Sequence, residues 1–418
     1  MKKQENTGQN NVGSRFPYEL FFWNRIRISL LLVLLLFFNI FHIGAQDLKA
    51  IQLLFSPVEK KDQLDSFFKK TKEAGLDSVI IRLFSLPGDR DFWRRKGEEN
   101  FSGVYFRTKH APSKDIFLPE ILKSAKKFGI KVFGWMTTRK SVWALNEHPE
   151  WADVYYDINS KKFRYHVDRL DIFNPAVCNY LTELLKDVPK NGLDGLLFQD
   201  DLVIRYNEGF TKSGVNGYHE FSGNETRTMP KDFFSEISFC AEDNRSYVTK
   251  FTKDYYKWQE WKNLYLISLL NNFSDELKSR NESFKVIYNC YYETIISPDK
   301  ASEWLSQDIS SIQKYLNVDH ISIMLYHIQM CRELKKNFAD IKKMVDAGLK
   351  NNIQSSKVVI KIQLKDWKTR KCEPSDKIEQ IVRMLKDNNI NNFIFVPIDN
   401  ISDMELVRVA LNVLNRKG

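Results

Sequence analysis

The stretch Gly192-Leu-Asp-Gly-Leu-Leu-Phe-Gln-Asp-Asp201 decides the fold. Residues 196–198 form a short apolar run bounded by glycine and polar residues, which is typical of a strand buried on both faces. Asp200 and Asp201 follow where this strand leaves the sheet. Carboxylates at the carboxyl end of a buried parallel strand are costly unless something uses them. Taken alone, the pair favours a capped or salt-bridged turn, so the rest of the chain has to decide whether it does chemistry.

Outward from this stretch, apolar runs alternate with helical stripes of apolar residues. Predicted strands lie at residues 49–55, 78–84, 130–135, 196–198, 283–289, 320–325, 357–364 and 391–396. Predicted helices lie at residues 62–74, 118–128, 175–188, 247–279, 302–316, 333–349, 377–385 and 403–414. The alternation predicts an α/β fold with a parallel sheet and crossover helices. Eight strands indicate a (β/α)8 TIM-like barrel over residues 47–418, since the first strand lacks the glycine-rich loop of a doubly wound sheet.

Three predicted strand-to-helix loops are long, at residues 85–115, 136–174 and 199–245. A barrel builds its active site from these loops. They carry Trp93, Tyr105, Trp143, Trp151, Tyr155, Tyr156, Tyr206 and Tyr218. A cleft walled by aromatic rings suits a polymeric carbohydrate, although aromatic-rich packing explains the same composition.

The N-terminus carries the longest apolar stretch, ISLLLVLLLFFNIFHI at residues 28–43. Arg25 and Arg27 precede it, and Gly44-Ala-Gln46 follows. We therefore expect residues 1–46 to be a cytoplasmic tail plus a signal peptide or an uncleaved signal anchor. The stretch is short for a full span of roughly 20 residues. Either reading places the body in the periplasm or another extracytoplasmic space, and an anchor would hold it at the membrane.

Composition argues against several other classes of function. The net charge is +10, but the two signs alternate along the chain without an arginine-rich stripe, so no nucleic-acid partner is predicted. The five cysteines are scattered without a CxxC motif, and the seven histidines include no H-x-x-x-H pair. We therefore expect neither a disulfide framework nor a metal or other cofactor.

Cleavage of a glycosidic bond needs an acid that protonates the leaving oxygen and a second group on the other face of the sugar. Asp200 and Asp201 are the catalytic candidates, and an N-acetyl group of the substrate is a candidate second group. Neighbouring side chains on extended chain point to opposite sides, so we expect one aspartate to do chemistry and the other to orient a residue or sugar.

Several stretches resemble the C-terminal glycoside hydrolase domain of PgaB-type exopolysaccharide proteins. They are VFGWM at 132–136, RLDIF at 169–173, LDGLLFQDD at 193–201 and PIDN at 397–400, with Asn289, Tyr326, Gln363 and Trp367 after later strands. The resemblance implies a glycoside hydrolase that acts on partially deacetylated poly-β-1,6-N-acetylglucosamine. It implies Asp200 as the catalytic acid, beside Asp201.

The resemblance also implies a set of substrate-binding residues, namely Trp135, Arg169, Asn289, Tyr326, Gln363 and Trp367. The expected partners are the polysaccharide and an exopolysaccharide export machinery. The metal-dependent deacetylase domain that family members carry ahead of the barrel is not expected in this chain.

Two alternatives follow from departures from the family pattern. Gln199 stands where the family usually has histidine, and Gln52 and Leu54 stand where its first strand ends in acids. These residues favour a non-catalytic polysaccharide-binding or export scaffold that uses the same cleft, or a different substrate. A metal-dependent barrel hydrolase is the third hypothesis, based on His320 and His327 near one strand.

Overall fold

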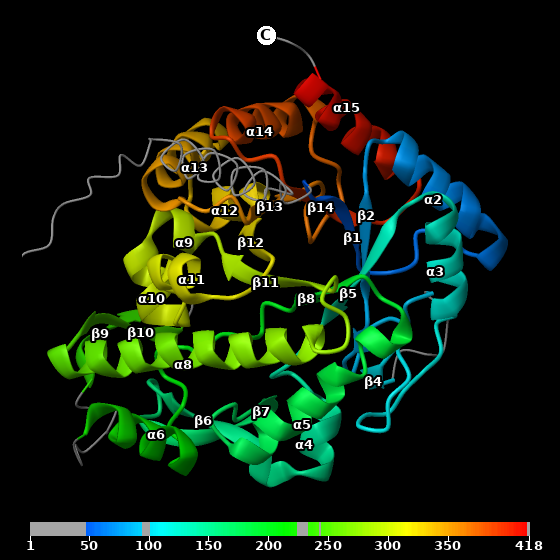
Figure 1. The fold of residues 1–418 in the computed structure, drawn as a ribbon. Helices are drawn as coiled ribbons and strands as arrows, with labels where there is room; N and C mark the ends of the chain where they lie inside the picture. Colours follow the sequence, from blue (N-terminus) through cyan, green and yellow to red (C-terminus); the bar gives the residue numbers. More distant parts are fainter. Residues whose placement is uncertain (1–46, 94–100, 224–232, 242–243, 416–418) are drawn as a thin grey trace, which may run out of the picture. The chain divides into compact units, whose positions relative to one another are not determined.

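The computed structural model describes residues 47–93, 101–223, 233–241 and 244–415. Eight parallel strands close a barrel in the order β1-β14-β13-β12-β11-β8-β5-β2, with helices around it (Figure 1). The barrel lies within the compact unit that begins at Leu48. The predicted (β/α)8 barrel with long inserted loops is thus confirmed. The apolar stretch at 28–43 lies outside the described residues, and no helix within them is long and apolar enough to cross a membrane.

All eight barrel strands lie where the sequence predicts them. They are β1 (Lys49–Leu53), β2 (Ser78–Arg82), β5 (Lys131–Met136), β8 (Gly195–Phe198), β11 (Lys285–Tyr291), β12 (His320–Leu325), β13 (Val358–Gln363) and β14 (Phe393–Ile398). The helices between them are α2 (Leu64–Glu73), α3 (Leu118–Lys127), α5 (Pro175–Lys186), α8 (Lys253–Lys278), α9 (Glu293–Ile296), α10 (Pro298–Leu305), α11 (Ile309–Tyr315), α12 (His327–Glu333), α13 (Phe338–Asn352) and α14 (Ser375–Asp387), and α15 (Asp403–Asn415) follows β14.

Apolar side chains fill two layers, because each barrel strand is buried on both faces. One layer lies between the strands and the helices. The other fills the barrel interior and comprises Leu48, Ala50, Ile80, Phe133, Leu197, Ile287, Val359 and Ile394, with Trp135 packed against it. Because side chains alternate along a strand, the residue two positions after each member of this layer also points inward and lies nearer the carboxyl end of the strand. Those positions hold polar residues, among them Gln52, Asn289 and Lys361.

Gly195 begins β8 because the interior leaves no room for a side chain there. A Cβ atom at this position would lie 2.4 Å from the Phe133 ring and 2.5 Å from the Lys285 carbonyl oxygen. The glycine therefore lets β8 approach β5 and β11 closely.

The long loops fold into hairpins and short helices that the sequence did not predict. The loop after β2 forms β3 (Phe84–Ser85) and β4 (Gly103–Val104). The loop after β5 contains α4 (Val142–Glu147), β6 (Ala152–Asp157) and β7 (Lys162–Leu170). The loop after β8 contains α6 (Lys212–Ser222), β9 (Phe234–Cys240) and β10 (Arg245–Phe251). Each of the three long loops therefore contains a small antiparallel sheet of two strands.

Two predicted helices have different bounds in the structure. The helix predicted at 247–279 begins only at Lys253, because residues before it pair with β9 and the Thr252 side chain caps the helix by accepting from the Tyr255 N–H. The helix predicted at 302–316 is interrupted at Ser306, which has a left-handed φ of 53° and donates its hydroxyl to the Ile204 carbonyl.

Candidate active site at the barrel mouth

The two aspartates after β8 have different surroundings. The buried Asp201 carboxylate accepts from the Thr137 hydroxyl (2.8 Å) and from the N–H groups of Thr138 (3.0 Å) and Lys140 (2.8 Å). Burial raises the Asp201 pKa, and these hydrogen bonds oppose the shift. Asp201 thus ties the end of β8 to the turn after β5.

Asp200 is only partly buried and lies near Tyr291, which ends β11, and Tyr326, which directly follows β12. The Tyr291 hydroxyl donates to the Asp200 carbonyl oxygen (3.2 Å) and lies 3.4 Å from its Oδ2. Burial raises the pKa of both Tyr291 and Tyr326, and the Asp200 charge raises each further. Both phenols therefore stay protonated at neutral pH and can donate hydrogen bonds near this carboxylate.

The floor of the site is a short series of hydrogen bonds between polar groups inside the barrel. The Lys361 ammonium donates to Asn289 Oδ1 (3.2 Å), and the Asn289 amide donates to the Phe198 carbonyl (2.9 Å). Lys361 is 1% exposed. Burial lowers the Lys361 pKa to about 7, against the opposing effect of Asp200. Lys361 therefore shares this floor with the predicted binding residue Asn289 and the predicted acid Asp200.

Several buried polar atoms on inward positions have no hydrogen-bond partner among the described residues. They are Gln52 Oε1 on β1, Trp135 Nε1 on β5 and Ser322 Oγ on β12. Buried polar atoms in proteins are rarely left unpaired, so an unmatched group needs an explanation. All three atoms lie above the apolar interior layer, where a polar ligand bound at the barrel mouth would supply the missing hydrogen-bond partners.

The predicted binding residues after β12 and β13 divide into two groups. Tyr326 and Trp367 pack edge to face with their ring centroids 5.3 Å apart, which gives the mouth an aromatic wall. The Gln363 side chain instead serves the protein itself, since it donates to the Lys365 carbonyl (2.9 Å) and accepts from the Gln329 N–H (3.3 Å). Gln363 therefore shapes the two loops that carry the aromatic pair.

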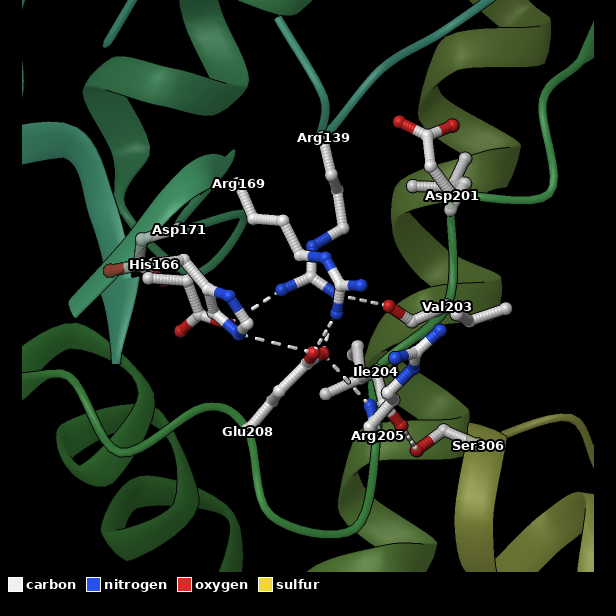
Figure 2. A network of polar contacts seen from close by, with 12 residues as sticks. Arg139, His166, Arg169, Asp171, Asp201, Val203, Ile204, Arg205, Glu208 and Ser306 are labelled. Carbon is white, nitrogen blue, oxygen red and sulfur yellow. Dashed lines mark hydrogen bonds and ion pairs between the residues drawn. The ribbon is translucent and has the colours of Figure 1, made fainter. Parts of the chain in front are cut away.

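Arg169 belongs to an ion-pair network that joins the loops after β5 and β8. It takes no part in the hydrogen bonds of Lys361 and Asn289 near Asp200. Figure 2 shows Arg139, Arg169 and His166 directed at the Glu208 carboxylate. Arg139 also contacts Asp153 (2.5 Å) and donates to the carbonyls of Val203 and Leu170. The network joins the turn after β5 to the segment that follows Asp201.

The two carboxyl groups of this network, Glu208 and Asp153, have pKa values shifted in opposite directions. Burial alone would raise the Glu208 pKa, but Arg139, His166 and Arg169 hold it well below its usual value. Burial raises the Asp153 pKa to about 8; Arg139 opposes this shift, and Glu208 and Asp171 add to it. Glu208 is thus the carboxylate that contacts both guanidinium groups and is kept in its charged form by them.

Ligand atoms of Asp153, His166 and Glu208 lie within 4.8 Å of one another, a spacing that a metal ion could bridge. Both carboxylates already contact guanidinium groups, so the arrangement fits an ion-pair cluster better than a metal site. The two histidines of the metal-hydrolase hypothesis lie at opposite ends of β12, since His320 begins the strand and His327 follows its end.

The comparisons with known proteins concern the family and the fold. Residues 56–396 match the model of a family described as "Hypothetical glycosyl hydrolase family 13". The chain belongs to this family. It is therefore classed with the glycoside hydrolases, as the sequence predicts. No curated protein matches the sequence.

Solved structures show the same fold. The PgaB (BpsB) glycoside hydrolase domain from Bordetella bronchiseptica matches with a TM-score of 0.67 and 16% identity, over 87% of this chain and 98% of that one. The catalytic domain of a beta-amylase from Paenibacillus polymyxa matches with a TM-score of 0.53 and 8% identity, over 85% and 93%. A beta-galactosidase from Rahnella sp. R3 matches with a TM-score of 0.53 and 12% identity, over 88% and 56%.

Sequence reasoning missed Lys361, Tyr291 and Ser322 at the mouth. Strict alternation in Val358–Gln363 places Val359, Lys361 and Gln363 on one face, so a lysine in a strand that must be buried was the available signal. Nothing local in the sequence marks Tyr291 or Ser322, because their relevance depends on strand register.

Breaking the ion-pair network should destabilise the protein strongly. Glu208→Gln removes the anion that faces the buried Arg139 and the half-buried Arg169, and losing one partner of a buried pair costs about 3–5 kcal/mol. Glu236→Gln is the matched control, since its pair with Lys250 is exposed and should be worth less than about 1 kcal/mol. Urea unfolding of both variants measures the difference. Equal losses of unfolding free energy in the two variants would contradict the assignment.

A second lysine under the network should make stability depend on pH. Lys262 on α8 donates to the Arg205 carbonyl (2.7 Å), and burial lowers its pKa to about 7 despite the opposing effects of Glu208 and Asp153. Between pH 7 and about 10 the unfolded chain therefore binds more protons at this lysine than the folded protein does. Over that window the wild type should gain stability relative to Lys262→Met, by up to about 1.4 kcal/mol per pH unit.

Urea unfolding at pH 7, 8 and 9 tests this dependence. The exposed Lys257→Met on the same helix serves as the control. A difference between wild type and Lys262→Met that stays constant with pH would show that Lys262 keeps its proton in the folded protein.

Proposed function

We propose that this protein cleaves a β-1,6-linked, partially deacetylated N-acetylglucosamine polymer, with Asp200 as the general acid. The family membership and the fold shared with the PgaB glycoside hydrolase domain support the choice of polymer. The observation that carries the role of Asp200 is the contrast within the pair: the carboxylate of Asp201 is buried among hydrogen bonds from the 137–140 turn, whereas Asp200 is partly exposed.

In this proposal Asp200 protonates the leaving glycosidic oxygen. Asp201 acts as a positioning residue that orients Asp200 through the backbone. Of the two predicted catalytic residues, Asp200 alone then contacts the reacting atoms. Trp135, Asn289, Tyr326 and Trp367 line the sugar cleft, while Arg169 and Gln363 support its walls. The acetamido group of the substrate supplies the second reacting group, as it does in the substrate-assisted glycosidases.

Asp200→Asn should reduce the release of reducing ends from defined β-1,6-glucosamine oligomers by about 10²–10⁴-fold, because an amide cannot donate the proton. Mass spectrometry of the products measures this release, and thermal unfolding should show that the variant remains folded. Asp254→Asn on the surface of α8 is the control and should keep full activity. Activity retained in Asp200→Asn would overturn the assignment, and binding without turnover by the wild type would favour the scaffold hypothesis.

We also propose that the barrel is exported, through the segment at 28–43, to an extracytoplasmic space where it meets the polysaccharide and its export machinery. The basic residues before the apolar stretch support this proposal. Fractionation of cells that express the full chain should place it outside the cytoplasm, and the N-terminus of the recovered protein would distinguish a cleaved signal from an anchor. Recovery in the cytosolic fraction would contradict export.

A further inference from the structure

The upper layer of the barrel interior presents more hydrogen-bond donors than its own residues use. Lys361 has three N–H hydrogens, and its one hydrogen-bond acceptor within the described residues is Asn289 Oδ1. Trp135 Nε1 is a buried donor without a partner in the same part of the structure, and an indole N–H can only donate. The Ser322 hydroxyl, also unpaired there, can donate as well.

The charge of this layer also favours a ligand that brings a hydrogen-bond acceptor over one that brings a cation. The inward positions at this level are occupied by neutral polar groups such as Gln52, Asn289 and Ser322. Arg82 at the end of β2 is paired with Asp89 (3.1 Å), so this cation is balanced. Lys361 is a buried cation that faces Asp200, and an ammonium group of a ligand bound over Lys361 would be placed close to a like charge.

Resting on the function proposed above, we propose that Lys361 determines substrate specificity: the floor of the site accepts a sugar that brings an oxygen acceptor, such as an acetamido carbonyl, and discriminates against a sugar with a free amine. The Lys361 ammonium donates to that oxygen, and the Trp135 indole N–H is a further buried donor at the mouth. An unprotonated acceptor satisfies the buried donors, whereas a protonated amine leaves them unpaired and repels the lysine. The polymer is therefore bound with an N-acetylated unit over Lys361.

Binding to the inactive Asp200→Asn variant tests this inference without relying on turnover. The probes are a fully N-acetylated β-1,6-glucosamine hexamer, the same hexamer with every amine free, and a glucuronate oligosaccharide, measured by calorimetry at pH 6. We expect the acetylated hexamer to bind at least about tenfold more tightly than the free-amine hexamer, as expected for a hydrogen bond to a charged donor. Tighter binding of the glucuronate oligosaccharide than of either hexamer would support the acceptor requirement but overturn the proposed polymer.

Lys361→Met, combined with Asp200→Asn, should reduce this preference to about twofold or less, because methionine keeps the chain length but removes the donor. Lys357→Met, an exposed lysine just before β13, should leave the preference unchanged. Lys361→Gln keeps a donor without the charge and should retain part of the preference, which provides a second test if the methionine variant does not fold.

The outcomes separate the inference from the proposed function. Equal or tighter binding of the free-amine hexamer, or an undiminished preference in Lys361→Met, would overturn the role of Lys361 while leaving Asp200-dependent cleavage intact. Failure of the wild type to cleave any hexamer, together with a preserved preference in binding, would overturn the proposed hydrolysis but support the inference. Absence of binding by all three probes would overturn both.

Discussion

The buried guanidinium of Arg139 is the constraint on which the geometry of the mouth depends. It is 1% exposed and has contacts for its donors in every direction: two carboxylates, Asp153 and Glu208, and two main-chain carbonyls, those of Leu170 and Val203. These partners come from two of the three long inserts, those after β5 and after β8. A guanidinium can hold so many partners because its five N–H groups form a rigid plane. Since Val203 lies two residues beyond Asp201, the network fixes the chain directly after the two aspartates.

Asp201 completes this arrangement from the other side. Its hydrogen bonds to the turn after β5 fix that turn, and Arg139 lies in the same turn. The turn after β5 and the segment after β8 are therefore joined twice, once through a carboxylate and once through a guanidinium. Such double attachment gives Asp200 a defined place at the end of β8 without requiring its own carboxylate to form structural bonds. The unequal environments of two adjacent aspartates follow from this division between holding the backbone and facing the mouth.

The barrel could be predicted from the sequence because its signals are local. Apolar runs such as that at 196–198, helix-ending glycines such as Gly75 and Gly129, and the strand count do not depend on distant contacts. The hairpins of the inserts could not be read in the same way, since Arg245–Phe251 is a strand only through its pairing with β9. The candidate site was predicted only in part. Asn289 lies near the carboxyl end of β11, and Asp200, Tyr326 and Trp367 follow strands, where barrel chemistry is expected. The contact of Arg169 with Glu208 could not be predicted, because the two residues are 39 apart in sequence.

A buried, inward-facing lysine such as Lys361 indicates a ligand site more specifically than an acid at the end of a strand does. A lysine in the interior of a barrel loses hydration, and the lowered pKa reflects that cost. Replacing it with an apolar residue of similar length would remove the cost, so packing alone gives no reason for a lysine above the layer of Leu197, Ile287 and Val359. The same reasoning applies to the indole N–H of Trp135, which a phenylalanine would avoid burying. Both groups are donors and both lie at the mouth that Asp200 borders, so their combined cost is best explained by an oxygen-bearing ligand that pairs with them when it binds.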